Sequence, residues 1–88
     1  MKKQIVHDRE NLLSRISIDP NICFGKPCIR GHRVWVSLIL DFLAAGMSME
    51  EILKQYPGLE PGDIYACIAH GAEMSRTTDL EILLEARS

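Results

Sequence analysis

The sequence predicts a mainly α fold: a three-helix, helix-turn-helix (winged-helix-like) domain with a short N-terminal β-arm over residues 1–75. Three observations predict it. Apolar residues repeat at helical spacing in successive segments, capping residues separate those segments, and two isoleucines alternate before a Gly/Pro-containing stretch. Residues 76–88 are expected to form a C-terminal helical or partner-binding tail. A chain of 88 residues supports one compact domain at most.

The β-arm is expected before the helices. Ile16 and Ile18 alternate as in a strand, and the sequence DPN at 19–21 is typical of a turn. Residues 25–34 contain Gly25, Pro27 and Gly31, which favours an irregular arm or a small hairpin. Gly31 is expected to supply a backbone angle that other residues rarely adopt.

The first two predicted helices follow Trp35, where the apolar residues change to helical spacing. Gly46 is placed to end the first of them in a left-handed conformation. Ser48 begins the second, with Glu51 three residues later as in a capping box. This helix is expected to end at Tyr56, because the next residue is a proline.

The third predicted helix begins near Pro61, since a proline in the first turn costs no hydrogen bond. Its apolar stripe is expected to consist of Ile64, Cys67, Ile68, Gly71 and Ala72. The residues expected to face outward are Gly62, Tyr65, Ala66, Ala69, His70 and Glu73.

The compartment is expected to be the cytoplasm, with no membrane partner. No apolar run approaches the ~18 residues that span a bilayer, and no apolar stretch follows the N-terminal lysines. The cysteine count of three is odd, which suits a reducing environment better than a disulfide scaffold.

Nucleic-acid binding is suggested by local charge, although the net charge of the whole chain is −2. No acidic residue lies between Pro20 and Leu40, where Lys26, Arg30 and Arg33 are suited to phosphate contacts and His32 to hydrogen bonding. The outward face of the third helix would add Tyr65 and His70, but it carries no Arg or Lys for base readout. The alternative is a solvated loop with ordinary surface charges.

Metal binding and catalysis are both disfavoured. Cys23, Cys28, Cys67 and His70 have the number of ligands for a structural zinc site, but Cys67 falls on the apolar stripe. A Cys28/His32 nucleophile pair would need an orienting third group, and nothing identifies one. We therefore expect no catalytic residue, no metal and no cofactor, and the chain is not expected to be an enzyme.

Two segments, residues 18–34 (IDPNICFGKPCIRGHRV) and 45–59 (AGMSMEEILKQYPGL), resemble the domain-of-unknown-function 433 family. The resemblance spans roughly residues 14–74, and Phe24 departs from it where the family often has a glycine. The family is similar to winged-helix and helix-turn-helix proteins and is associated with VapB-type antitoxins. It implies a PIN-like ribonuclease toxin as partner and brings no catalytic residues.

The resemblance also implies that the C-terminal segment occupies the toxin. The amphipathic pattern of this segment and its charge indicate the contact residues Leu80, Leu83, Leu84 and Arg87. A packed fourth helix is the alternative for this segment. The sequence thus predicts an antitoxin of a type II toxin-antitoxin pair that binds the toxin and operator DNA. The small core favours a homodimer. A protein-interaction or dimerisation module without DNA binding is the alternative function.

Overall fold

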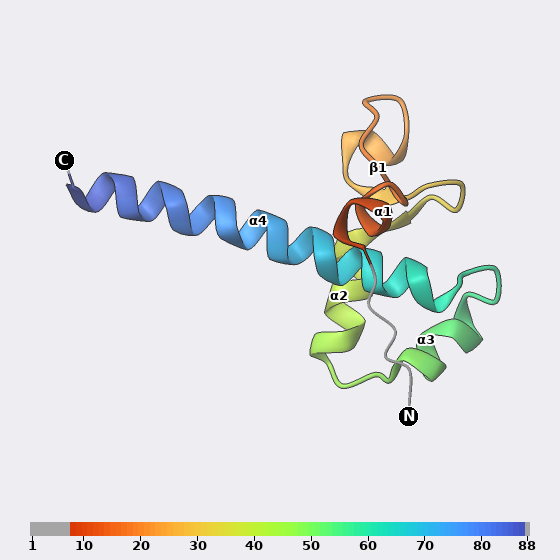
Figure 1. The fold of residues 1–88 in the computed structure, drawn as a ribbon. Coiled ribbons are helices and arrows are strands. Elements are labelled where there is room, and N and C mark those ends of the chain that lie inside the picture. The colour runs from red at the N-terminus through yellow and green to blue at the C-terminus, as the bar shows by residue number, and fades with distance from the viewer. Residues whose placement is uncertain (1–7, 88) are drawn as a thin grey trace.

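The computed structural model describes residues 8–87 and the side-chain surroundings of residues 8–76. Its elements are α1 (Arg9–Leu13), β1 (Ile16–Ser17), the 3-10 turn η1 (Cys23–Gly25), β2 (Cys28–Ile29), β3 (Val34–Trp35), α2 (Val36–Ala44), α3 (Met49–Gln55) and α4 (Pro61–Arg87). The described residues form four α-helices and one small antiparallel sheet (Figure 1), which confirms the mainly α prediction. The helix-turn-helix assignment stays a prediction, and α1 was not expected from the sequence.

The sheet forms the arm and has the strand order β1-β2-β3. Ile16 pairs with Ile29 and Ser17 with Cys28, so Ile18 would face Pro27. Proline has no backbone N–H to extend the ladder, and the strand ends before Ile18, whose exposed fraction is 63%. The expected continuation of the strand through Ile18 is therefore wrong.

The predicted caps are present and explain where α2 and α3 end and begin. Gly46 has a φ of 100°, and the amides of Gly46 and Met47 donate to Leu43 and Phe42, which is a Schellman motif. Ser48 and Glu51 form the reciprocal capping box, with distances of 3.1 and 2.8 Å. These local signals depend on adjacent residues, so they were readable from the sequence.

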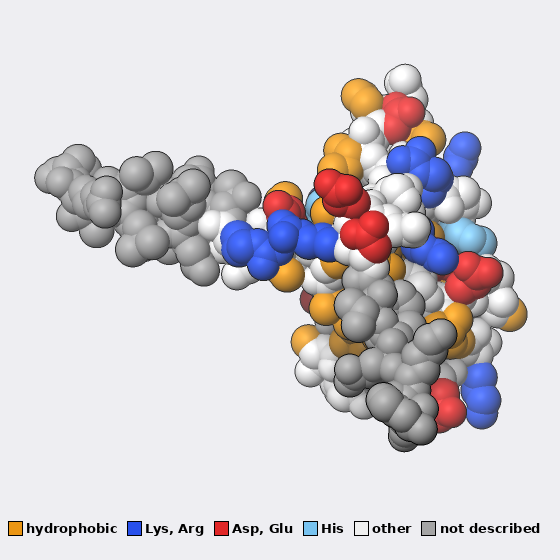
Figure 2. Space-filling model, in the orientation of Figure 1, with side chains coloured by type: hydrophobic (Ala, Val, Ile, Leu, Met, Phe, Trp, Pro, Cys, Tyr) orange, Lys and Arg blue, Asp and Glu red, His pale blue; other side chains and the backbone are white. Residues whose placement is uncertain are grey.

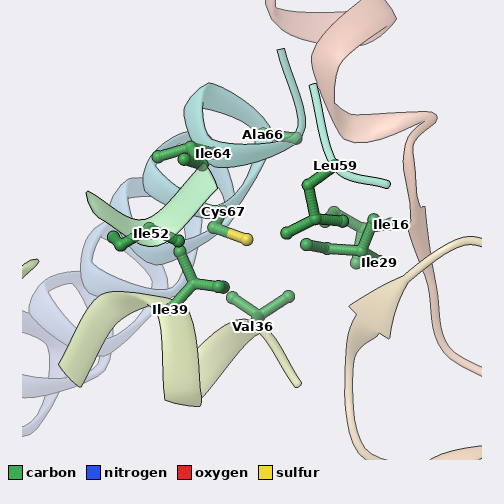
Figure 3. Close-up of a cluster of buried hydrophobic side chains, with 9 residues drawn as sticks. All are labelled: Ile16, Ile29, Val36, Ile39, Ile52, Leu59, Ile64, Ala66 and Cys67. Carbon is green, nitrogen blue, oxygen red and sulfur yellow. The ribbon is translucent and has the colours of Figure 1, made fainter. Parts of the chain in front are cut away.

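The core joins the sheet to three helices. Figure 3 shows Leu59 beside Ile16 and Ile29 of the sheet, while Cys67 of α4 lies near the helical isoleucines. The buried residues of this core are Ile16, Ile29, Val36, Ile39, Ile52, Leu59, Ile64, Ala66 and Cys67. Each packed side chain contributes by burial, at about 25 cal/mol per Å² of apolar surface removed from water.

The buried face of α4 differs from the predicted stripe. Ile64 and Cys67 are fully buried as expected, but the exposed fraction of Ile68 is 45%, and Ala66 and His70 are buried. The expectations that Ile68 faces the core and that Ala66 and His70 face outward are wrong.

The reason is α1, which packs against α4 (Figure 1). Arg9 of α1 pairs with Glu73 of α4, and a Cβ on Gly62 would meet the Arg15 guanidinium at 2.8 Å. Contacts on this additional side turn the buried face away from Ile68.

Helix α4 runs without a break through Arg87 and extends away from the other elements in Figure 1. Its 27 residues span about 40 Å at 1.5 Å per residue. The predicted boundary between residues 75 and 76 falls inside this helix, and the division into domain and tail stays a prediction. No helix in the described part of the chain is long and apolar enough to cross a membrane.

Candidate functional site

The β2–β3 turn places the basic side chains of the arm at the surface. Gly31 has a φ of 85° and Arg33 a φ of 57°, and the amides of His32 and Arg33 both donate to the Ile29 carbonyl oxygen. The unusual angle predicted at Gly31 is confirmed. Arg30, His32 and Arg33 are exposed, and Figure 2 shows Lys and Arg side chains around this turn with a histidine nearby.

Arg30 is held by the strand beside it. Its Nε donates to the Ser14 carbonyl oxygen at 3.0 Å, and its Nη2 donates to the Ile16 carbonyl oxygen at 3.1 Å. The Arg30 amide also donates to the Arg15 carbonyl oxygen at 2.8 Å. The guanidinium therefore fastens β1 to β2, a role that is independent of any nucleic acid.

Replacing Arg30 with alanine should destabilise the protein, because it removes two charge-assisted hydrogen bonds to backbone carbonyls. We expect a loss of about 1–2 kcal/mol, or roughly 4–16 °C in melting temperature. Arg33→Ala is the matched control and should change stability by less than about 0.5 kcal/mol. Thermal denaturation by circular dichroism measures both. Equal effects of the two substitutions would contradict the fastening role.

Lys26 and Trp35 lie together at the base of the arm. The Lys26 Nζ sits 5.1 Å from the centre of the Trp35 ring, a cation–π arrangement. His32 lies against the loop before α4, since a Cβ on Gly58 would stand 3.4 Å from its Cε1. Lys26, His32 and Arg33 are thus exposed cationic or polar groups of one arm.

The two α4 residues predicted to contact DNA, Tyr65 and His70, differ in exposure. Tyr65 is 38% exposed, whereas His70 is 9% exposed and points between helices. The two residues lie on different sides of α4, so the structure does not join all six predicted DNA-contacting residues on one surface. The predicted partner-binding residues Leu80, Leu83, Leu84 and Arg87 lie outside the residues whose side chains are described.

The thiols do not form the four-ligand set considered from the sequence. Burial raises the pKa of Cys28 to about 11, assisted by its hydrogen bond with Cys23. Burial raises the pKa of Cys67 to about 12, and the nearby Asp63 carboxylate adds to the effect. Among the described residues, no three His, Cys, Asp or Glu side chains gather as a metal site would require. Cys28 is also a poor nucleophile while it stays protonated.

Thiol accessibility should separate Cys23 from the other two cysteines. In the native protein at pH 8, we expect Ellman's reagent to modify Cys23 rapidly, because it is partly exposed while Cys28 and Cys67 are buried. All three thiols should react after denaturation in guanidinium. Mass spectrometry of the labelled protein identifies each site, and rapid native labelling of Cys67 would contradict the described core.

The turn before β2 is a feature that sequence reasoning missed. Cys23, Phe24 and Gly25 have φ values of 53°, 57° and 79°, and the Phe24 ring is 90% exposed. The left-handed conformation costs roughly 1–2 kcal/mol at a non-glycine residue. The resemblance contained a signal for this turn, since the family often has a glycine where Phe24 stands.

The family-model comparison and the comparison with solved structures both relate this chain to the same family. A family model described as "Protein of unknown function (DUF433)" matches residues 16–70. The chain is also similar to a crystal structure of a DUF433 member protein from Anabaena variabilis, with 30% sequence identity and a TM-score of 0.68. That alignment covers 84% of this chain and 73% of the other. A search of curated proteins found no match.

Proposed function

The chain belongs to the DUF433 family, and from that premise we propose that it is an antitoxin-like protein whose α4 helix binds a partner. The observation that carries the proposal is the extension of α4 through Arg87, away from the helices and sheet that pack around its first half (Figure 1). A helix that is already formed loses less conformational freedom on binding than a disordered segment.

The sequence of the extension suits a helix that lies in an apolar groove. Leu80, Leu83 and Leu84 occur at helical spacing, which is the pattern by which amphipathic helices anchor to partners. We refer to the part of α4 after Arg76 as the α4 extension.

The proposed partner is a PIN-like ribonuclease toxin, the class that the family resemblance implies. The α4 extension would inhibit it sterically, by covering the acidic metal site. An acidic site attracts positive charge, which Arg87 carries within the extension and Arg76, paired with Glu73 at 2.9 Å, carries just before it.

The test is inhibition of RNA cleavage by a PIN-like ribonuclease encoded beside this chain and co-expressed with it. Replacing Leu80, Leu83 and Leu84 with serine should weaken inhibition by on the order of 100-fold or more, since each buried leucine contributes about 1.5–3 kcal/mol. Glu81→Gln with Glu85→Gln is the control in the same segment and should keep inhibition. Full inhibition by the serine variant would refute the proposal.

Operator DNA is a second proposed ligand, favoured by the exposed cations of the arm. Lys26 and Arg33 are exposed, whereas Arg30 is engaged with backbone carbonyls and the first half of α4 packs one face against the core. The arm would therefore supply most phosphate contacts, and a homodimer would present two arms.

Binding of the full chain to its own upstream DNA across a salt series tests this ligand. Lys26→Ala with Arg33→Ala should weaken binding and flatten its salt dependence, because fewer counterions are released. Lys54→Ala, on α3, is the control. No binding at low salt would leave the alternative function, a protein-interaction module without DNA binding.

A further inference from the structure

A groove lies between the start of α2 and the middle of α4, apart from both the arm turn and the α4 extension. It encloses about 310 Å³, at the lower end of the size of small-molecule sites. Its apolar lining consists of Pro27, Val36, Leu40, Gly71 and Met74. At Gly71 the Leu40 side chain of α2 comes close to α4, since a Cβ there would stand 3.2 Å from the Leu40 Cδ1.

His70 brings a buried polar group to this groove. Its exposed fraction is 9%, and its side chain forms part of the lining. No residue in the described part of the chain forms a hydrogen bond with its ring. In the described part of the chain no fully buried side-chain nitrogen or oxygen lacks a hydrogen-bond partner, so the unpartnered nitrogens of His70 are not sealed off and a molecule in the groove can reach them.

The α2 end of the groove favours a negative charge. Trp35 is the N-cap of α2 and provides no side-chain hydrogen bond, so the first turn keeps amide donors beyond that of Val36. Val36 itself donates to the Pro27 carbonyl oxygen at 3.1 Å. Ser37 and Lys26 line the same end, and the lysine adds its charge to the positive end of the helix.

We propose that this groove binds a small carboxylic acid with a branched apolar body. The carboxylate lies at Lys26 and the first turn of α2 and accepts a hydrogen bond from His70, while the apolar body packs against Leu40 and Met74. One lysine in the lining matches a single negative charge better than a phosphate, which carries more. This ligand does not depend on the partner protein or the DNA proposed above, although Lys26 is also one of the two exposed arm cations assigned to DNA.

The test is a titration of the ¹⁵N-labelled full chain with 4-methylpentanoate, followed by NMR. We expect saturable shifts at the amides of Ser37 and Gly71. The uncharged amide 4-methylpentanamide should bind about 10-fold more weakly because it lacks the charge, and acetate should bind weakly because it lacks the apolar body. Equal binding of acid and amide would overturn the proposal.

Variants test the two polar side chains of the groove separately. Lys26→Ala should weaken 4-methylpentanoate binding about 5-fold, whereas Lys54→Ala, which removes an exposed lysine from α3, should leave it unchanged. His70→Phe keeps a ring in place and should also weaken binding. Because Lys26 is exposed, its variant tests the site even if His70→Phe does not fold. Unchanged affinity in Lys26→Ala, or tighter binding of an acetylated dipeptide ending in leucine, would overturn the small-acid assignment.

Discussion

Ile64→Ala should destabilise the protein by about 2–5 kcal/mol, the range measured when a large aliphatic side chain is removed from a packed core. Ile64 is fully buried on α4 in the core shared by the helices and the sheet. In a domain of this size, such a loss lowers the melting temperature by roughly 10 °C or more. Urea denaturation followed by circular dichroism measures the change in the free energy of unfolding.

Ile68→Ala is the matched control, because it removes the same atoms from the same helix one turn later. Ile68 is 45% exposed, so the substitution should change stability by less than about 1 kcal/mol, and the helix propensity of alanine offsets part of that. Ile64→Val should give an intermediate loss of about 0.5–1.5 kcal/mol if the alanine variant does not fold. Equal losses at positions 64 and 68 would mean that α4 buries the stripe predicted from the sequence instead.

This pair of isoleucines marks the limit of what periodicity could predict. The 3.6-residue pattern correctly indicated a helix from Pro61 and the burial of Ile64 and Cys67. It could not locate the edges of the buried face, because those depend on α1, which comes from a distant part of the chain. Local signals fared better: the Gly46 and Ser48 caps depend on neighbouring residues and were predicted correctly.

The candidate site was predictable in composition but not in arrangement. The run without acidic residues correctly indicated a basic surface arm, and Gly31 its turn. The engagement of Arg30 with the Ser14 and Ile16 carbonyl oxygens depends on how β1 and β2 pair, which no local pattern specifies. His70 was misplaced because its burial depends on α2 and the base of the arm, which helical periodicity within α4 does not specify.

Asp63→Ala should be the second severe substitution, with a loss of about 2 kcal/mol. The Asp63 side chain is 8% exposed, accepts from Arg15 Nη1 at 3.0 Å, and accepts from the Glu60 amide at 2.8 Å. The second bond reaches back over the start of α4, where a negative charge also stabilises the positive helix end. Removing the carboxylate takes the side-chain acceptor from the Glu60 amide, leaves Arg15 Nη1 only its exposed bond to Glu60, and loosens the connection between α1, β1 and α4.

Glu60→Ala separates this local role from simple charge pairing with the same arginine. Glu60 accepts from Arg15 Nη1 at 2.9 Å, but its side chain is 70% exposed. Water screens that pair, so its loss should cost less than about 0.5 kcal/mol. A double-mutant cycle of Arg15→Ala with Asp63→Ala should then show coupling, because the two groups share a hydrogen bond. Additive losses, or equal effects at positions 60 and 63, would mean that the start of α4 is stabilised by core packing alone.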